Sequence, residues 1–452
     1  TGSTEVAQIS NRQLGETAPD AMLIAETGGM NAMIVDSTAL PEQAVRDILA
    51  SAFQSAGQRC SALRILYVQR DVEERVLDML FGAMEALRLG DPWKLSTDIG
   101  PVIDEEARQG ILSYCAEMEG RGRLLKWLDR VGAGLHVAPH VFRVSGIEEM
   151  EREVFGPVLH VARFDADRIG EVIDAVNAKG YGLTFGLHTR IDARVQQVVD
   201  RLHTGNLYVN RNQIGAVVGS QPFGGEGLSG TGPKAGGPLY LTRFRKPLDT
   251  AVDDTAPAGS PVSARAVQTA LSGLAPAGWA TMPTRISTLR GLLRGAVADA
   301  MSATAALDMG PMDLPGPTGE SNRLTMVPRG TVLCLGPDPE MLRAQVVQAL
   351  GTGNAVLAVA PGAAEALAML AGADLPLAVL DGTLPSDLLT DLPVDAVASP
   401  DTRLRRDLAR RDGPILPLIT ARIDPAAYVH ERAVCIDTTA AGGNATLLAK
   451  AG

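Results

Sequence analysis

One cysteine and one glutamate stand in glycine-bearing turns from which they could act together on a carbonyl group. Cys60 follows Gly57 by three residues, and Glu26 directly precedes the turn that contains Gly28 and Gly29. The thiolate is the attacking form of cysteine, and backbone N–H groups in such a turn can stabilise it. A carboxylate close by can then serve as general base toward water. The pair predicts covalent catalysis on a carbonyl, with the N–H of Cys60 as half of an oxyanion hole.

Each of these residue types also has a structural role that needs no chemistry. A cysteine without a special context is usually buried and inert, and most glutamates lie exposed on the surface. The glycine-bearing context favours catalysis for Cys60 and Glu26. Cys115, Cys334 and Cys435 lack that context, so we expect them to be structural.

The composition describes an acidic globular chain. Its 452 residues are 46% hydrophobic and 21% charged, with a formal net charge of −11. An acidic chain lacks the basic surface that nucleic acids require, and no apolar run approaches the roughly 20 residues of a membrane span. The four cysteines and six histidines show no ligand spacing, so we expect no disulfide framework and no metal. With no signal peptide, a cytoplasmic location is expected.

The elements that must position Cys60 and Glu26 follow from hydrophobic periodicity. Strands are predicted at 21–24, 32–35, 63–68, 158–164 and 205–210, and helices within 1–16 and at 41–56, 72–87, 104–119, 168–178 and 192–203. The helix over 41–56 stops at Gly57, so Cys60 lies in the connection to the next strand. Glycine is very dense from residue 215 to 237, which predicts a loop fitted closely to another backbone or to a ligand.

A polar, proline-bearing stretch at 249–262 predicts a linker between a first domain, 1–248, and a second domain, 263–452. Beyond residue 325, strands are expected at 332–335, 355–360, 377–380, 396–399 and 415–419, with helices at 340–350, 362–371 and 403–411 between them. Repeated βα units with short buried strands indicate an α/β fold with a parallel, doubly wound sheet.

Five ordered motifs carry a family resemblance. They are Thr1-Gly2-Ser3-Thr4-Glu5, Glu26-Thr27-Gly28-Gly29, Gly57-Gln58-Arg59-Cys60, Glu153-Val154-Phe155-Gly156-Pro157 and Pro222-Phe223-Gly224-Gly225. Residues 1–245 resemble the C-terminal half of an aldehyde dehydrogenase, with only the end of its Rossmann-type coenzyme domain. Residues 210–219 and 233–238 look like the L-glutamate γ-semialdehyde (Δ1-pyrroline-5-carboxylate) dehydrogenase modules of bifunctional proline utilization proteins, and residues 431–445 resemble the end of their long forms.

The resemblance implies a role for each matched residue. Cys60 is the implied nucleophile, and Glu26 is the implied base that hydrolyses the thioester. The implied cofactor is NAD, held by Gly2, Ser3, Thr27, Glu153 and Phe155. The implied substrate contacts are Ser61, Gly215, Ala216 and Phe223. Thr27 stands where the family usually has Leu, which matters little because only its backbone is used there.

The implied reaction is the NAD-dependent oxidation of L-glutamate γ-semialdehyde to L-glutamate, the second step of proline catabolism. The resemblance also implies a homodimer and an upstream proline dehydrogenase domain with FAD in the same polypeptide. Thr1 lies inside a phosphate-binding turn, so we expect the chain to be cut from something longer. Two alternatives stay open. One is a non-catalytic fragment or scaffold, since the family's oxyanion-hole Asn and ribose-binding Lys would lie upstream; the other is a dehydrogenase for another aldehyde.

The second domain looks like a degenerate copy of the coenzyme-binding fold. Residues 347–358 resemble the coenzyme-binding strand of an aldehyde dehydrogenase, but Val359 stands where that family has its ribose-binding Lys. We therefore expect a non-catalytic Rossmann-like domain that does not bind NAD. Its glycine-rich tail at 438–445 is expected to act as a lid over an aldehyde tunnel.

Overall fold

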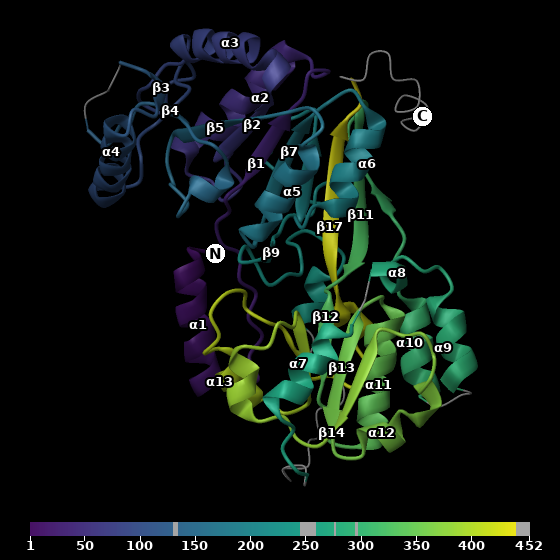
Figure 1. Ribbon diagram of the computed structural model, residues 1–452. Coiled ribbons are helices and arrows are strands. Elements are labelled where there is room, and N and C mark those ends of the chain that lie inside the picture. The colour runs from purple at the N-terminus through teal and green to yellow at the C-terminus, as the bar shows by residue number, and fades with distance from the viewer. Residues whose placement is uncertain (130–133, 245–258, 275–276, 294–296, 440–452) are drawn as a thin grey trace.

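Two sheets organise the protein, and they lie at opposite ends of the molecule (Figure 1). The structure is a computed structural model that describes residues 1–129, 134–244, 259–274, 277–293 and 297–439. The larger sheet belongs to the part that carries Cys60, and the smaller sheet belongs to the C-terminal part. This arrangement is the α/β fold that the sequence predicts.

The larger sheet has ten strands in the order β10-β11-β17-β8-β7-β1-β2-β5-β4-β3. The seven strands from β17 to β4 run parallel, and antiparallel strands close both edges. Their bounds are β1 Ala32–Val35, β2 Ile65–Gln69, β3 Leu124–Trp127, β4 His140–Arg143, β5 Val158–Phe164, β7 Thr184–His188, β8 Asn206–Val209, β10 Met312–Leu314, β11 Glu320–Pro328 and β17 Val429–Asp437. Strands β6 (Tyr181–Gly182) and β9 (Glu226–Gly227) form a separate small pair.

Five helices accompany this sheet: α2 Pro41–Phe53, α3 Glu73–Glu85, α4 Glu105–Gly120, α5 Ile169–Ala178 and α6 Asp192–Arg201. Helix α1 (Thr4–Thr17) instead lies beside α13 (Leu404–Leu408) of the C-terminal part (Figure 1). Helix α2 begins at Pro41, where a proline costs no hydrogen bond, and it packs against α3. Helices α5 and α6 lie in front of the strands in Figure 1. These helices agree with the predicted ones to within a few residues. The strand expected at 21–24 does not form.

The smaller sheet has five parallel strands in the order β14-β13-β12-β15-β16. The bounds are β12 Thr331–Cys334, β13 Ala355–Ala360, β14 Leu377–Asp381, β15 Ala396–Ala398 and β16 Leu418–Ile419. Numbered along the chain this is the order 3-2-1-4-5, which is the doubly wound topology. The prediction of a second, doubly wound α/β unit is confirmed.

Side chains alternate between two cores across this sheet, as successive residues of a strand must. Val356 and Ala358 of β13 pack with α11 (Pro339–Gly351) and α9 (Arg285–Leu293). Leu357 and Val359 face the opposite core, which α7 (Ala264–Ser272) and α13 (Leu404–Leu408) cover. Val359 is therefore an interior side chain of that core. Two further helices, α10 (Ala298–Ala306) and α12 (Ala363–Ala366), pack beside α11.

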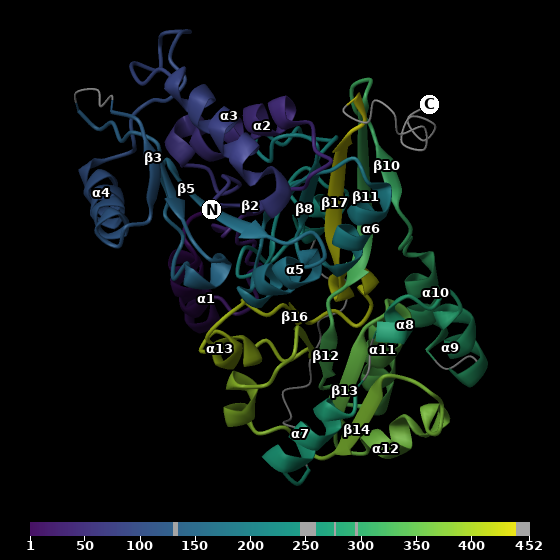
Figure 2. The ribbon, with the colours of Figure 1, turned by 45° about the horizontal axis from the view of Figure 1, so that its top comes forward.

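The chain returns to the larger sheet after it has built the smaller one. Strand β17 inserts between β8, with which it is parallel, and β11, with which it is antiparallel (Figure 2). Both β11 and β17 lie beyond residue 262, so a single division at 249–262 does not separate the two sheets. Of that predicted linker, residues 249–258 lie outside the described residues, as does the tail from 440 onward.

Gly336 provides a test of the smaller sheet. A Cβ added to it would stand 2.5 Å from the backbone nitrogen of Leu342 in α11. Because backbone cannot yield as a side chain does, Gly336→Ala should lower the free energy of unfolding by about 2 kcal/mol or more. The matched control is Gly110→Ala within α4, where nothing stands within 4 Å; it should raise stability by about 0.5–1 kcal/mol. Denaturant titration of both variants compares them directly, and equal stabilities would contradict the close packing.

Candidate active site

A cavity of about 1170 Å³ opens between the start of α1, the turn after α2 and the glycine-rich loop. Nine of the eleven predicted site residues line it: Gly2, Ser3, Cys60, Ser61, Glu153, Phe155, Gly215, Ala216 and Phe223. They come from parts of the chain more than 200 residues apart. The two others, Glu26 and Thr27, are not among the lining residues, although Gly28 of the same motif is.

A left-handed turn delivers Cys60 to the cavity. Helix α2 ends at Phe53, and Ser55, Ala56 and Gly57 then all adopt positive φ angles of 53–65°. Such a conformation costs non-glycine residues roughly 1–2 kcal/mol each, so the surrounding structure must hold it. At Gly57 a Cβ would collide with the carbonyl oxygen of Gly156, so glycine is required there. The strain therefore sits directly before the candidate nucleophile.

The side chain of Asn31 fixes the backbone of the turn that carries Cys60. Its buried amide donates to the carbonyl oxygens of Cys60 at 2.7 Å and Ala62 at 2.9 Å. Burial raises the pKa of the Cys60 thiol, and the negative charge of Glu26 raises that pKa further. The N–H groups of Ser61 and Cys60 lower the same pKa by hydrogen bonding. The net direction is upward, so the sulfur needs a base to become a thiolate.

Glu26 lies in a cradle of glycines beside the cavity. Its Oε2 accepts a hydrogen bond of 3.2 Å from the N–H of Gly225, and Oε1 is buried with no partner among the described residues. A Cβ at Gly224 would stand 2.8 Å from Oε1. Burial raises the pKa of Glu26 to about 7, while the cation of Lys234 opposes that rise. A carboxyl group with this pKa can exchange protons near neutral pH.

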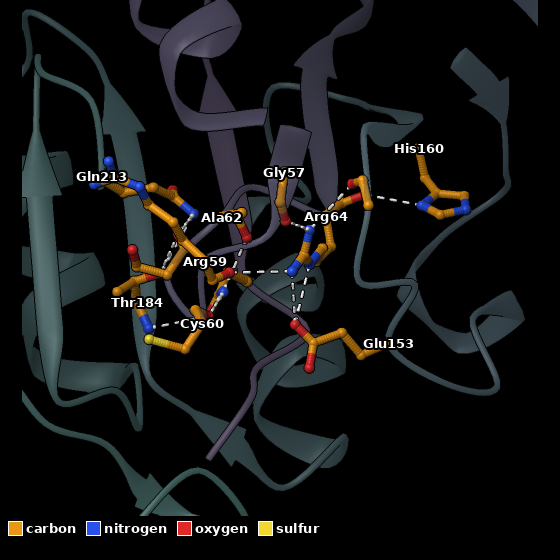
Figure 3. A network of polar contacts seen from close by, with 12 residues as sticks. Gly57, Arg59, Cys60, Ala62, Arg64, Glu153, His160, Thr184 and Gln213 are labelled. Carbon is orange, nitrogen blue, oxygen red and sulfur yellow. Dashed lines mark hydrogen bonds and ion pairs between the residues drawn. The ribbon is translucent and has the colours of Figure 1, made fainter. Parts of the chain in front are cut away.

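Glu153 is held by a buried arginine, as Figure 3 shows. Arg64 donates twice to Glu153 Oε1, from Nε at 3.1 Å and from Nη2 at 2.9 Å. The same guanidinium donates to the carbonyl oxygens of Gly57 at 2.7 Å and Arg59 at 3.1 Å. Its central carbon lies 5.1 Å from the ring centre of Phe155. Arg64 therefore joins the residues expected at the cofactor to the turn that carries Cys60.

The cavity suits a nucleotide cofactor on the side of α1. Ser3 caps this fourteen-residue helix by accepting from the N–H of Val6, and the helix start faces the cavity, as pyrophosphate binding requires. The carboxylate of Glu153 lies across Gly28 so closely that a Cβ there would collide with it. Thr27 turns its hydroxyl to Leu228 and its N–H to Ser229, which leaves only its carbonyl oxygen for a ligand.

The opposite wall of the cavity comes from the glycine-rich loop. Gly215 has a φ of +73°, and it lines the cavity with Ala216 next to Ser61. Phe223 is half-buried, and its backbone pairs with Ala235 across the loop. Small residues and one hydroxyl beside one aromatic ring can receive a short chain that has a polar end.

Neither a metal cluster nor a membrane helix appears in the described part of the chain. No group of three or more His, Cys, Asp or Glu side chains is placed to hold a metal ion there. In the same residues, no helix combines the length and apolar character needed to cross a bilayer. The four cysteines are free thiols.

Three supporting residues were not predicted: Arg64, Asn31 and Lys234. A lone arginine at the start of an apolar strand is a signal for Arg64, because a charge is buried only where it is paired. Lys234 lies in the stretch 233–238 that resembles the family, but that resemblance implied no role for its side chain. Nothing in the sequence around Asn31 distinguishes it from a surface amide.

The cavity is lined by residues from all five motifs that carry the family resemblance. The model of the aldehyde dehydrogenase family matches residues 1–247, and the chain belongs to that family. It is 44% identical to the bifunctional protein PutA of Salmonella typhimurium, over 99% of this chain and 35% of that protein. It is 39% identical to the 1-pyrroline-5-carboxylate dehydrogenase of Geobacillus kaustophilus, over 48% of this chain and 43% of that protein.

A solved structure extends the likeness to the C-terminal part. The structure of proline utilization A from Corynebacterium freiburgense matches 96% of this chain and 41% of its own, with a TM-score of 0.65 and 25% sequence identity. The chain spans about a third of the length of the curated PutA relatives, 35% in the case above.

The buried ion pair of Arg64 supports a stability prediction. Arg64→Met leaves the Glu153 carboxylate buried without its cation, which should cost about 3–5 kcal/mol in the free energy of unfolding. The control Arg70→Met removes an exposed pair with Asp165 and should change little. The double variant Arg64→Met/Glu153→Gln should regain part of the loss in denaturant titrations. Similar effects of the two single variants would contradict the assignment.

Proposed function

We propose that this chain is the dehydrogenase part of an enzyme that oxidises L-glutamate γ-semialdehyde to L-glutamate with NAD. The observation that carries the proposal is the shared cavity, where Cys60, Glu153 and the start of α1 meet. The likeness to proteins named PutA and 1-pyrroline-5-carboxylate dehydrogenase supports the choice of aldehyde.

The first step is addition of Cys60 to the aldehyde. The Cys60 thiol first gives up its proton to solvent, and the N–H groups of Ser61 and Cys60 stabilise the thiolate that remains. The sulfur forms a bond to the carbonyl carbon, and backbone N–H groups of the Cys60 turn stabilise the oxygen that becomes negative. A bound nicotinamide supplies the acceptor for the hydride that leaves this carbon. A thioester on Cys60 is the two-electron oxidised product.

The second step is hydrolysis of that thioester. Glu26 takes a proton from water, whose oxygen attacks the acyl carbon and breaks the carbon–sulfur bond. The Oε1 atom of Glu26 has no other partner among the described residues, so it is available for this water. The products are the carboxylic acid and the restored Cys60.

The cofactor and substrate contacts follow from the walls of the cavity. Glu153 would accept hydrogen bonds from ribose hydroxyls, and Phe155 would pack near the nicotinamide, while Gly2 and Ser3 would face the pyrophosphate. Ser61, Gly215 and Ala216 would hold the substrate carboxylate, and Phe223 would cover its methylene groups. The pyrophosphate and carboxylate contacts rely on neutral donors at a helix start and a glycine loop.

The relatives suggest the setting of this module. We infer an FAD-dependent proline dehydrogenase domain upstream in the same polypeptide, and assembly as a homodimer. The residues beyond 262 would serve the fold rather than the chemistry, since Val359 is a core side chain. A comparison of glutamate semialdehyde with other short aldehydes separates the proposed substrate from the alternative of a different dehydrogenase.

The nucleophile is tested by a cysteine exchange in the protein expressed from its complete gene. Cys60→Ala should lower NADH formation from glutamate semialdehyde by at least about 10³-fold, because no other group forms the thioester. The control is Cys115→Ala, at a buried cysteine in α4 away from the cavity. It should retain most of the rate, and unchanged turnover in Cys60→Ala would overturn the mechanism.

The base is tested by pH. Turnover limited by hydrolysis should rise through a midpoint near the Glu26 pKa of about 7, because only the ionised carboxylate accepts a proton. Glu26→Gln should still acylate Cys60, so it should give a single burst of NADH followed by very slow turnover. Stopped-flow absorbance measures both phases, and a fast steady state in this variant would rule out Glu26 as the base.

A further inference from the structure

One peptide group connects two buried charges behind the active site. The N–H of Gly225 donates to Glu26 Oε2, and the carbonyl oxygen of Gly224 accepts from the ammonium group of Lys234. These N–H and C=O groups belong to the same peptide bond, between Gly224 and Gly225. A cation at its oxygen and an anion at its hydrogen polarise the group in the same direction, so each hydrogen bond strengthens the other.

Lys234 has an unusual environment for a lysine. Its side chain is buried, with 3% of the residue exposed, and its ammonium also donates to Asn206 Oδ1 at 2.8 Å. The two oxygens that accept from its nitrogen, those of Asn206 and Gly224, are both neutral. A buried cation of this kind is costly unless some nearby charge offsets it, and Glu26 exerts the largest favourable effect of any charge on it.

The C-terminal strand β17 fixes the position of Lys234. Glu431 of β17 accepts a hydrogen bond of 2.7 Å from the backbone N–H of Lys234. The neighbouring residue of the strand, His430, contacts Glu226 of the same glycine-rich loop at 3.2 Å. Strand β8 holds the other end, because Asn206 accepts both from Lys234 and from the N–H of Gly224. Two neighbouring strands of the larger sheet, β8 and β17, therefore hold Lys234 and the Gly224–Gly225 peptide group in place.

We propose that Lys234 is a positioning residue for the general base, acting on Glu26 through the Gly224–Gly225 peptide group and held there by β17. The proposal deepens the proposed function and rests on the role of Glu26 in it. Lys234 touches neither substrate nor cofactor. Its positive charge keeps Glu26 ionised in a buried place and its hydrogen bond fixes the peptide that orients Oε2.

The charged groups around both residues set the expected sign. Besides Lys234, the hydrogen bond from the N–H of Gly225 favours the ionised form of Glu26, and the charge of Glu26 raises the pKa of Cys60. Lys234 in turn is faced by Glu26, Glu431, Glu226 and Arg432. Burial lowers the Lys234 pKa to about 8, so it is largely charged at pH 7. Loss of this cation must raise the pKa of Glu26.

The test isolates thioester hydrolysis from cofactor and aldehyde. An activated ester, p-nitrophenyl acetate, acylates the cysteine in a burst of p-nitrophenol, and the steady rate that follows reports deacylation. Lys234→Met should keep the burst and move the pH midpoint of deacylation upward by roughly one unit. At pH 7 this corresponds to a rate about fivefold lower. Lys234→Arg keeps the charge and should stay closer to the parent midpoint.

The matched control is Lys179→Met. Lys179 also donates to two backbone carbonyls, those of Glu148 and Met150, but from the C-terminal end of α5. It should leave the midpoint in place.

If Lys234→Met does not fold, Lys234→Gln serves instead, since its amide can donate to Gly224 without a charge. An unmoved midpoint in folded Lys234→Met or Lys234→Gln, or a pH profile that Glu26→Gln does not remove, overturns the inference. A wrong aldehyde substrate would leave this ester assay unaffected, so the two failures are distinguishable.

Discussion

The active site depends on one buried guanidinium, that of Arg64. It binds the Glu153 carboxylate on one side and the carbonyl oxygens of Gly57 and Arg59 on the other. A buried arginine requires acceptors for its donors, and here two of them are backbone carbonyl oxygens of the turn that carries Cys60. The guanidinium that places Glu153 thus also holds the backbone directly after the left-handed Ser55 and Ala56. The Arg64 guanidinium therefore fixes both Glu153, which is expected at the cofactor, and the turn that carries Cys60.

The second dependence lies between the two parts of the chain. Strand β17 follows the smaller sheet in sequence, yet it is an interior strand of the larger one. Its alternate residues are buried, including Glu431, whose carboxylate reaches the glycine-rich loop. The C-terminal part is therefore more than an attached domain, because one of its strands supports the loop that surrounds Glu26.

Much of the fold was predictable from the sequence. Short apolar runs such as 158–164 became strands with the expected limits, because burial on both faces favours continuous hydrophobic residues. Strand β17 was missed because His430, Glu431 and Arg432 break its apolar pattern, and only tertiary ion pairs explain them. Cys60 and Glu153 line the same cavity, as the family motifs in the sequence imply. The supporting roles of Arg64 and Lys234 depend in part on distant contacts, with Glu153 89 residues from Arg64 and Glu431 197 residues from Lys234. Spacing alone does not reveal such contacts.

The late position of β17 has a consequence for synthesis on the ribosome. Until residues 429–437 have emerged, β8 presents an unpaired parallel edge, and such an edge readily joins a wrong strand. The sheet around Cys60 is complete only when residues 429–437 have been translated. A nascent chain that stops within the smaller sheet already carries the residues that line the cavity, yet its larger sheet lacks an interior strand. Such a product exposes an open strand edge, which favours aggregation of incomplete chains.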